Sequence, residues 1–165
     1  MRFGDGAWRM LDDVTPHYLS RVDGIEVSER AVELDVVNKL DEARWATLDG
    51  HMFSVRISSP MPNVFRIQTR HHKGRRERGV QYDIANEPQA LAVRQSPERV
   101  ELCAGALKLV LTHKPWGMVF EDANTGEPIT SSPFKAQGMM QKASHGLFMR
   151  EQFTLSVGEQ VYGLG

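Results

Sequence analysis

The chain has a single cysteine, no excess of either charge and no long apolar run. One cysteine, Cys103, excludes an internal disulfide framework. Lys and Arg number 20 against 21 Asp and Glu, and the net charge of -1 provides no overall field that would attract nucleic acid or an anionic membrane. No apolar run reaches the roughly 18 residues that cross a bilayer, and Met1–Gly6 lacks the apolar segment of a secretory signal. These absences predict a cytoplasmic protein without nucleic-acid or membrane partners.

Helical periodicity is scarce as well. No long stretch repeats apolar residues at the helical spacing without a breaker; Pro133–Ser144 is the best helical candidate, and Gly138 weakens it. Alternation with a period of two is common instead. Within Ala31–Val37 the apolar side chains share one face and the acidic ones share the other, which is typical of a half-buried β-strand.

Such alternating stretches recur at intervals of about ten residues, as in an all-β sandwich. Pro60 and Pro62 lack the N–H donor of a central ladder, so Ser58–Asn63 is predicted to be a turn between paired strands. We predict an all-β sandwich, mostly antiparallel, formed as one domain by residues 1–165. The expected strands are Ala7–Leu11, Ile25–Val27, Ala31–Val37, Phe53–Ile57, Val64–Arg70, Leu91–Val93, Arg99–Leu102, Leu107–Leu111, Trp116–Phe120, Glu127–Ile129 and Leu147–Ser156.

No metal-binding pattern accompanies these strands. His71 and His72 open a basic run that ends at Gly79, but adjacent residues on a strand point to opposite faces and do not easily share one metal. The run is short and has no interleaved aromatic residue, which favours a solvated loop or a surface facing another domain. Cys103 is interpreted as a half-buried strand residue. We therefore predict neither a metal nor a cofactor.

Acidic residues and tryptophans are the other candidates for chemistry. Glu121, Asp122 and Glu127 surround the predicted turn Asp122–Gly126, where acidic side chains are expected for turn geometry and solvation. Three tryptophans are each expected to pack in the core or at a domain interface, with stacking on a sugar ring as the alternative: Trp8, Trp45 and Trp116. The residues alone predict a sandwich without a catalytic constellation.

The last thirteen residues carry the strongest signal. Phe153–Val157 alternates like a strand and then gives way to a glycine-spaced turn, Tyr162-Gly163-Leu164-Gly165. Glycines at these positions suggest a sharp bend or a close approach to another element. No helix follows that would support a phosphate on this turn. We expect the chain to be cut here and the larger protein to continue.

This terminal stretch, from Leu155 to Gly165, resembles the end of the N-terminal β-sandwich in glycoside hydrolase family 31. Other segments agree in order and spacing with bacterial α-xylosidases of that family. They are Phe3–Trp8, Ser58–Ile67, His71–Gly74, Gly105–Leu109 and Trp116–Phe120. The resemblance covers the whole chain and implies a sandwich of the galactose-mutarotase-like type.

The resemblance also implies a parent enzyme that acts on α-xylosides or α-glucosides with retention. Retention requires two carboxyl groups about 5 Å apart. In the family both are aspartates of a downstream (β/α)8 barrel, so no catalytic residue is carried over to this chain. We predict that the sandwich packs on that barrel and that the parent enzyme contacts the carbohydrate. The sequence leaves open whether the parent enzyme forms a homo-oligomer. The residues predicted to shape the junction to the barrel, and to fray without it, are Tyr162, Gly163, Leu164 and Gly165.

Two alternatives remain open from the sequence. One is a self-standing carbohydrate-binding module that stacks sugars on Trp45 or Trp116. The other is an aldose-epimerase-like enzyme, which needs a His and a Glu converging on the sugar ring. The histidines available for that role are His71, His72, His113 and His145.

Overall fold

The computed structural model describes residues 2–5, 9–40, 50–71 and 89–162. The regular elements of these residues are all strands. The described residues contain no helix that is long and apolar enough to cross a membrane. The strands are β1 (Gly4–Asp5), β2 (Arg9–Met10), β3 (Val14–Tyr18), β4 (Arg21–Val27), β5 (Ala31–Val37), β6 (Met52–Met61), β7 (Val64–His71), β8 (Ala92–Gln95), β9 (Arg99–Ala104), β10 (Leu107–His113), β11 (Trp116–Asp122), β12 (Pro128–Ser132), β13 (Gly138–Lys142) and β14 (Gly146–Arg150).

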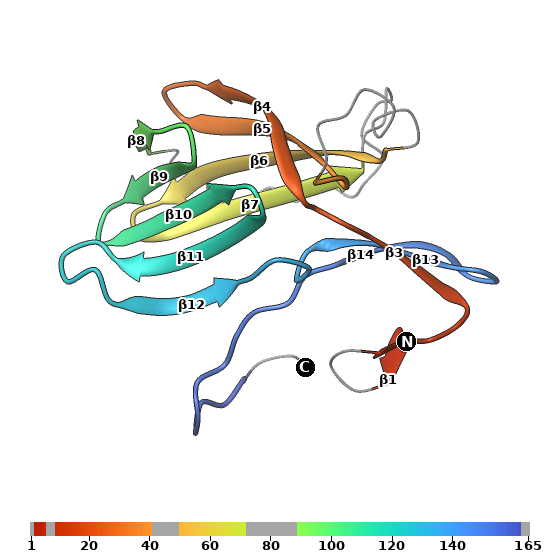
Figure 1. The fold of residues 1–165 in the computed structure, drawn as a ribbon. Coiled ribbons are helices and arrows are strands. Elements are labelled where there is room, and N and C mark those ends of the chain that lie inside the picture. The colour runs from red at the N-terminus through yellow and green to blue at the C-terminus, as the bar shows by residue number, and fades with distance from the viewer. Residues whose placement is uncertain (1, 6–8, 41–49, 72–88, 163–165) are drawn as a thin grey trace.

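Two antiparallel sheets form the sandwich (Figure 1). One has the order β4-β5-β6-β7 and the other the order β12-β11-β10-β9-β8. Most neighbours in the sheets are also neighbours in sequence, as expected for strands joined by short hairpins. The predicted mostly antiparallel β-sandwich is therefore confirmed.

The core lies between these two sheets. On β5 the pattern of buried and exposed residues follows the sequence alternation, because one face packs inward while Glu33 and Asp35 face solvent. Each sheet contributes side chains that are almost fully excluded from solvent. From the four-stranded sheet these are Val32, Leu34, Val36, Phe53, Val55 and Ile57; from the five-stranded sheet they include Val100, Leu102, Leu109, Leu111, Trp116 and Met118.

A third sheet, of order β14-β13-β3, brings the two ends of the chain together. The sequence did not predict β3, because Pro16 interrupts its apolar pattern. Pro16 is tolerated because β3 is an edge strand of this sheet, where one row of N–H groups needs no ladder partner. β1 and β2 form a separate two-stranded ribbon; β2 lies inside the predicted strand Ala7–Leu11.

The predicted helical candidate Pro133–Ser144 is wrong. This stretch contains β13, which pairs with β3 and β14, and Met139 and Met140 are both buried. Gly138 permits the pairing of β13 with β3. A Cβ at this position would lie 2.7 Å from the backbone oxygen of His17, so only glycine permits β13 to approach β3 so closely.

The last predicted strand and one predicted turn also differ from the structure. β14 ends at Arg150 rather than Ser156, so the alternation beyond Arg150 does not mark a strand. The β6–β7 turn is shorter than Ser58–Asn63, because β6 continues through Pro60 to Met61. The ladder register shifts between Ser58 and Met61, and such an irregularity accommodates proline.

The β6–β7 turn docks on the β9–β10 turn through Asn63. Its backbone N–H donates to the Ala104 oxygen at 3.2 Å, and its Oδ1 accepts from the Ala106 N–H at 2.6 Å. Gly105, with a φ of 64°, lies against this side chain, whose Oδ1 is the atom nearest to where a Cβ of Gly105 would be. The contact joins the four-stranded and five-stranded sheets at one end of the sandwich.

We expect Gly105→Ala to lower the free energy of unfolding by roughly 2–3 kcal/mol, since alanine is strained at positive φ and would collide with Asn63. The new Cβ would lie 2.3 Å from Asn63 Oδ1. Gly126→Ala is the matched control, because Gly126 has a φ of 75° but no atom within 4 Å of the position that the new methyl group would occupy. Urea unfolding of Gly126→Ala should show a loss of only about 1 kcal/mol. Equal losses in the two variants would show that the contact between Gly105 and Asn63 does not add to the stability.

Gln137 joins all three large sheets. Its Oε1 accepts from Trp116 Nε1 at 2.8 Å, and its Nε2 donates to Thr69 Oγ1 of β7 at 3.4 Å. Its backbone oxygen accepts from the Leu19 N–H at 3.1 Å, next to β3. Because Gln137 is only 2% exposed, water cannot replace these partners. This side chain therefore fixes how the sheets sit on one another.

Candidate functional site

Residues 151–162, here called the terminal segment, continue from β14 without strand structure. Figure 1 shows the segment passing β12 and then leaving the sandwich. Thr154 attaches it to β12: its N–H donates to the Ser131 oxygen at 2.8 Å, and its own oxygen accepts from Thr130 Oγ1 at 3.0 Å. Thr154 Oγ1 also accepts from the Ser131 N–H at 3.0 Å. Thr154 thus fastens the segment to β12 through these three hydrogen bonds.

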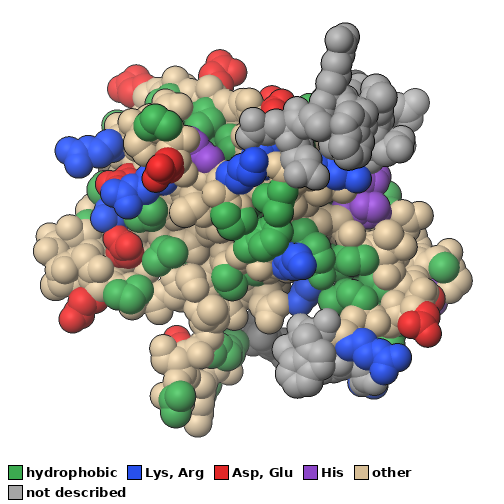
Figure 2. Space-filling model, in the orientation of Figure 1, with side chains coloured by type: hydrophobic (Ala, Val, Ile, Leu, Met, Phe, Trp, Pro, Cys, Tyr) green, Lys and Arg blue, Asp and Glu red, His purple; other side chains and the backbone are tan. Residues whose placement is uncertain are grey.

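Beyond this attachment the terminal segment exposes apolar side chains. The Phe153 ring contacts that of Phe120 at a centroid distance of 5.9 Å but keeps 46% of its surface exposed. Figure 2 shows the segment projecting from the body of the molecule with hydrophobic side chains on it. Its other exposed apolar residues are Leu155 (58%), Val157 (108%), Val161 (57%) and Tyr162 (83%). Contiguous apolar exposure of this kind is characteristic of an interaction surface.

A groove separates the terminal segment from the three-stranded sheet. Aromatic and aliphatic side chains line it together with the polar residues Arg150, Lys135 and Gln152. The apolar lining includes Met10, Tyr18, Phe134, Phe153 and Leu155. Phe153 and Leu155 belong to both the groove and the terminal segment, and we take the groove and the segment together as the candidate functional site.

Glu151 marks the point where the segment leaves β14. Its Oε1 accepts from Ser132 Oγ at 2.6 Å, although the residue as a whole remains exposed. Burial of the carboxylate raises the pKa of Glu151 above its ordinary value, and the hydrogen bond from Ser132 partly offsets this effect. No sequence pattern predicts this contact, because Ser132 ends β12 and Glu151 follows β14, two strands of different sheets.

Of the four predicted junction residues, the structure describes Tyr162. Its ring is exposed, and its hydroxyl donates to Gln160 Oε1 within the same segment. Gly163, Leu164 and Gly165 lie outside the described residues. The role of all four at a domain junction therefore stays a prediction.

Trp116 is not a sugar-stacking platform. It is 1% exposed, and its indole N–H is bonded to Gln137. Stacking on a sugar requires an open ring face, so the binding-module hypothesis loses this residue and the core-packing interpretation is confirmed. Trp8 and Trp45 lie outside the described residues.

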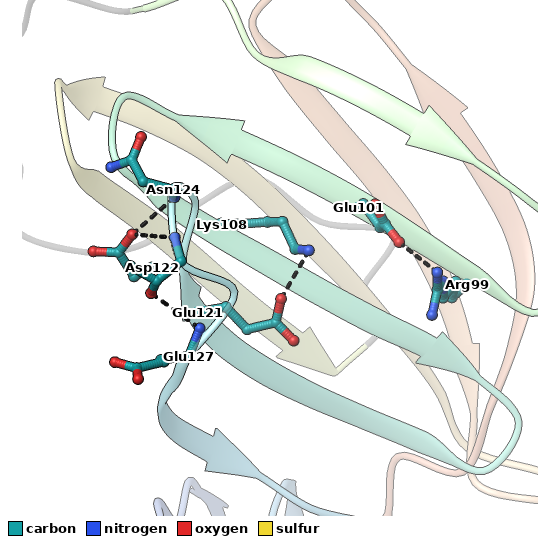
Figure 3. Close-up of polar contacts among 8 residues, drawn as sticks. Arg99, Glu101, Lys108, Glu121, Asp122, Asn124 and Glu127 are labelled. Carbon is teal, nitrogen blue, oxygen red and sulfur yellow. Dashed lines mark hydrogen bonds and ion pairs between the residues drawn. The ribbon is translucent and has the colours of Figure 1, made fainter.

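The acidic residues around the β11–β12 turn have structural partners (Figure 3). Asp122 Oδ1 accepts from the N–H groups of Asn124 and Thr125 at 2.8 and 3.0 Å. These bonds hold the pKa of Asp122 below its ordinary value. Glu121 pairs across the ladder with Lys108 at 2.8 Å. Asp122 thus shapes the turn, as the sequence predicted, whereas the cross-strand ion pair of Glu121 was not predicted.

The histidines considered for sugar chemistry lie on separate elements. His71, at the end of β7, contacts His51. The Nδ1 of His113 lies 2.9 Å from the Pro97 oxygen, and His145 lies in the β13–β14 turn with its Nδ1 3.0 Å from Ser144 Oγ. His72 and the basic run lie outside the described residues. Among the residues that are described, no three His, Cys, Asp or Glu side chains form a metal-binding group. Cys103 is half-buried on β9, as predicted.

Comparison with known families identifies the fold type. Residues 54–165 match the family model described as the glycosyl hydrolase 31 N-terminal galactose mutarotase-like domain. A solved structure of the cycloalternan-forming enzyme from Listeria monocytogenes, in complex with a pentasaccharide substrate, superposes with a TM-score of 0.59 at 14% identity. The superposition covers 79% of this chain and 11% of that one. At this identity the likeness shows the fold alone.

Two curated relatives align with the whole chain. One is an α-xylosidase of Emericella nidulans, 23% identical over 185 residues, and the other is the α-xylosidase XylQ of Lactiplantibacillus pentosus, 24% identical over 173 residues. Each alignment covers 100% of this chain but only 24% and 22% of the respective relative. The chain therefore spans about a quarter of the length of these proteins.

Proposed function

Because the chain belongs to the glycosyl hydrolase 31 N-terminal galactose mutarotase-like domains, we propose that it is the accessory, non-catalytic domain of a longer retaining α-glycosidase. In this proposal the sandwich packs on the catalytic barrel and helps to shape one wall of its active site. The observation that carries the proposal is the exposed apolar surface of the terminal segment. This surface is costly in water and would be covered by the rest of a longer chain.

We propose an α-xyloside as the substrate of the longer enzyme, with an α-glucoside as the competing class. The names of the two curated relatives support the xyloside. The selecting residues and both catalytic carboxylates would lie on the barrel. The proposal includes a cytoplasmic location, which cell fractionation would check. It does not fix the oligomeric state of the longer enzyme, which light scattering would measure.

The primary test compares this chain with the longer protein that contains it. We expect the longer protein to hydrolyse an aryl α-xyloside in preference to an aryl α-glucoside, with retention of configuration. The 165-residue chain alone should give no turnover of either substrate. Measurable hydrolysis by the chain alone would overturn the non-catalytic assignment, and a preference for glucoside would overturn only the substrate class.

The docking surface is tested by Leu155→Glu in both proteins. In the longer protein, we expect about a tenfold or greater loss of activity or of soluble yield, because a charge would be buried at the junction. In the 165-residue chain the thermal midpoint should not change, since Leu155 is exposed there. Val27→Glu is the matched control: Val27 is 44% exposed on the edge strand β4, away from the segment. Equal effects of the two substitutions in the longer protein would refute docking through the segment.

A titration with oligosaccharides distinguishes the accessory domain from a carbohydrate-binding module. Xylose- and glucose-containing oligosaccharides should bind the 165-residue chain no more tightly than millimolar. Tighter binding that is lost in Trp45→Ala, with unfolding unchanged, would favour the module instead.

A further inference from the structure

Three histidines that are far apart in sequence meet at the seam between two sheets. His17 lies on β3, His51 immediately precedes β6, and His71 ends β7. The His17 and His51 ring centroids are 4.0 Å apart, and those of His51 and His71 are 5.2 Å apart. Figure 2 shows histidine side chains together at the surface where Figure 1 draws the end of β7. We call these three residues the histidine cluster.

A hydrogen bond within the cluster depends on protonation. The Nδ1 of His51 lies 3.1 Å from the Nε2 of His71, so one nitrogen donates its proton and the other accepts with its lone pair. Two imidazolium rings have no lone pair between them, so this bond is absent when both are charged. The third ring, His17, packs on His51 and would add a further positive charge at short range.

Among the described residues, the charged groups that act on His51 are all positive. His17 of β3, His71 of β7 and Lys39, just after β5, all oppose a positive charge there. Asn38 faces the same residue but is neutral: its Oδ1 accepts from the His51 N–H at 2.8 Å, which holds the backbone in place. Gln141 of β13, near His17 Nε2 at 3.5 Å, is also neutral. A positive charge on His51 is therefore opposed by each of these described charged neighbours.

Its position connects two sheets. His17 belongs to the sheet β14-β13-β3, whereas His71 belongs to the sheet β4-β5-β6-β7. The Gln137–Thr69 hydrogen bond joins the same two regions, and Thr69 lies two residues before His71 on the same face of β7. We propose that the histidine cluster is a pH-sensitive latch that holds the three-stranded sheet on the four-stranded sheet when neutral and releases it when protonated.

The sign of the pH dependence follows from His51. Burial, followed by the charges of His17, His71 and Lys39, holds the pKa of His51 below its ordinary value of 6.5. The unfolded chain therefore takes up this proton at a higher pH than the folded chain. Stability that is fully present above about pH 6.5 is lost as the pH falls from there toward the folded-state pKa.

Thermal unfolding of the 165-residue chain between pH 8 and pH 5 tests the latch. We expect the wild-type midpoint to fall by about 3 °C or more beyond the fall seen in His51→Gln, which removes the titrating group. His145→Gln is the matched control, because His145 is exposed in a turn outside the cluster and should leave the wild-type profile unchanged. An identical pH profile for wild type and His51→Gln would overturn the proposal.

Two local measurements separate a latch from a merely structural role. In a proton NMR titration, the pKa of His51 should lie below its ordinary value of 6.5, and it should rise in His17→Gln and in His71→Gln. Amide exchange, corrected for its intrinsic pH dependence, should accelerate about tenfold in the β3–β13 ladder at pH 5.5 while the β10–β11 ladder stays protected. A His51 pKa that is unaffected by both substitutions, or equal acceleration of both ladders, would contradict a local latch.

Discussion

Replacing Trp116 with alanine is expected to lower the free energy of unfolding by about 3–5 kcal/mol, the range for deleting a large buried aromatic side chain. Trp116 is 1% exposed and belongs to the core cluster between the two main sheets. Its removal leaves a cavity and also takes away the donor to Gln137 Oε1. Urea unfolding of the 165-residue chain, followed by far-ultraviolet circular dichroism, measures the loss.

Leu147→Ala is the control for this experiment. This substitution also removes a large apolar side chain from a strand, but Leu147 is 55% exposed on β14. Its substitution should cost no more than about 0.5 kcal/mol. If Trp116→Ala cost as little as Leu147→Ala, the indole would not be buried in the core, and Trp116 would again be a candidate for sugar stacking.

Gln137→Met is expected to destabilise the chain by about 2–3 kcal/mol, because it leaves a buried donor without a strong acceptor. Methionine matches the length of glutamine, but its thioether sulfur is only a weak acceptor for Trp116 Nε1 and cannot donate to Thr69 Oγ1. Both bonds connect separate sheets. The loss should therefore appear as a lower urea midpoint, together with faster amide exchange at the junction of the sheets.

Gln95→Met is the matched control, since Gln95 is an exposed glutamine on the edge strand β8. Its effect should stay within about 0.5 kcal/mol. The double variant Trp116→Phe with Gln137→Met tests the pair directly. Phenylalanine has no N–H to leave unsatisfied, so adding Gln137→Met to Trp116→Phe should cost less than Gln137→Met in the wild type. Strict additivity would show that the hydrogen bond contributes nothing.

The sandwich itself was predictable because its strands have one solvent-facing side. On β5 the alternation of apolar and acidic residues reproduces the burial pattern directly. The same reasoning failed where burial has no such period. In β13 both Met139 and Met140 are buried, since β13 is the central strand of its sheet and its neighbourhood covers both faces. The strand β3 was missed for a different reason. Pro16 interrupts its pattern in the sequence, but an edge strand tolerates a residue without an N–H donor.

The terminal segment shows the opposite error. Phe153, Leu155 and Val157 alternate like a strand, but no neighbouring strand completes their backbone ladder within the described residues; Thr154 alone makes ladder-like contacts with β12. Alternation predicts which side chains share a face, whereas strand formation also needs a partner. The same sequence alternation therefore marks an exposed surface here rather than the last strand of the sandwich.

The sequence by itself determined the fold class, the order of the main hairpins and the family resemblance, because these depend on local periodicity, turn chemistry and short motifs. The tertiary structure alone decided that Trp116 is buried against Gln137 and that His17, His51 and His71 meet at one seam. These contacts join residues that are 20 or more positions apart in the sequence. No local pattern encodes them, since they arise only from how the sheets pack.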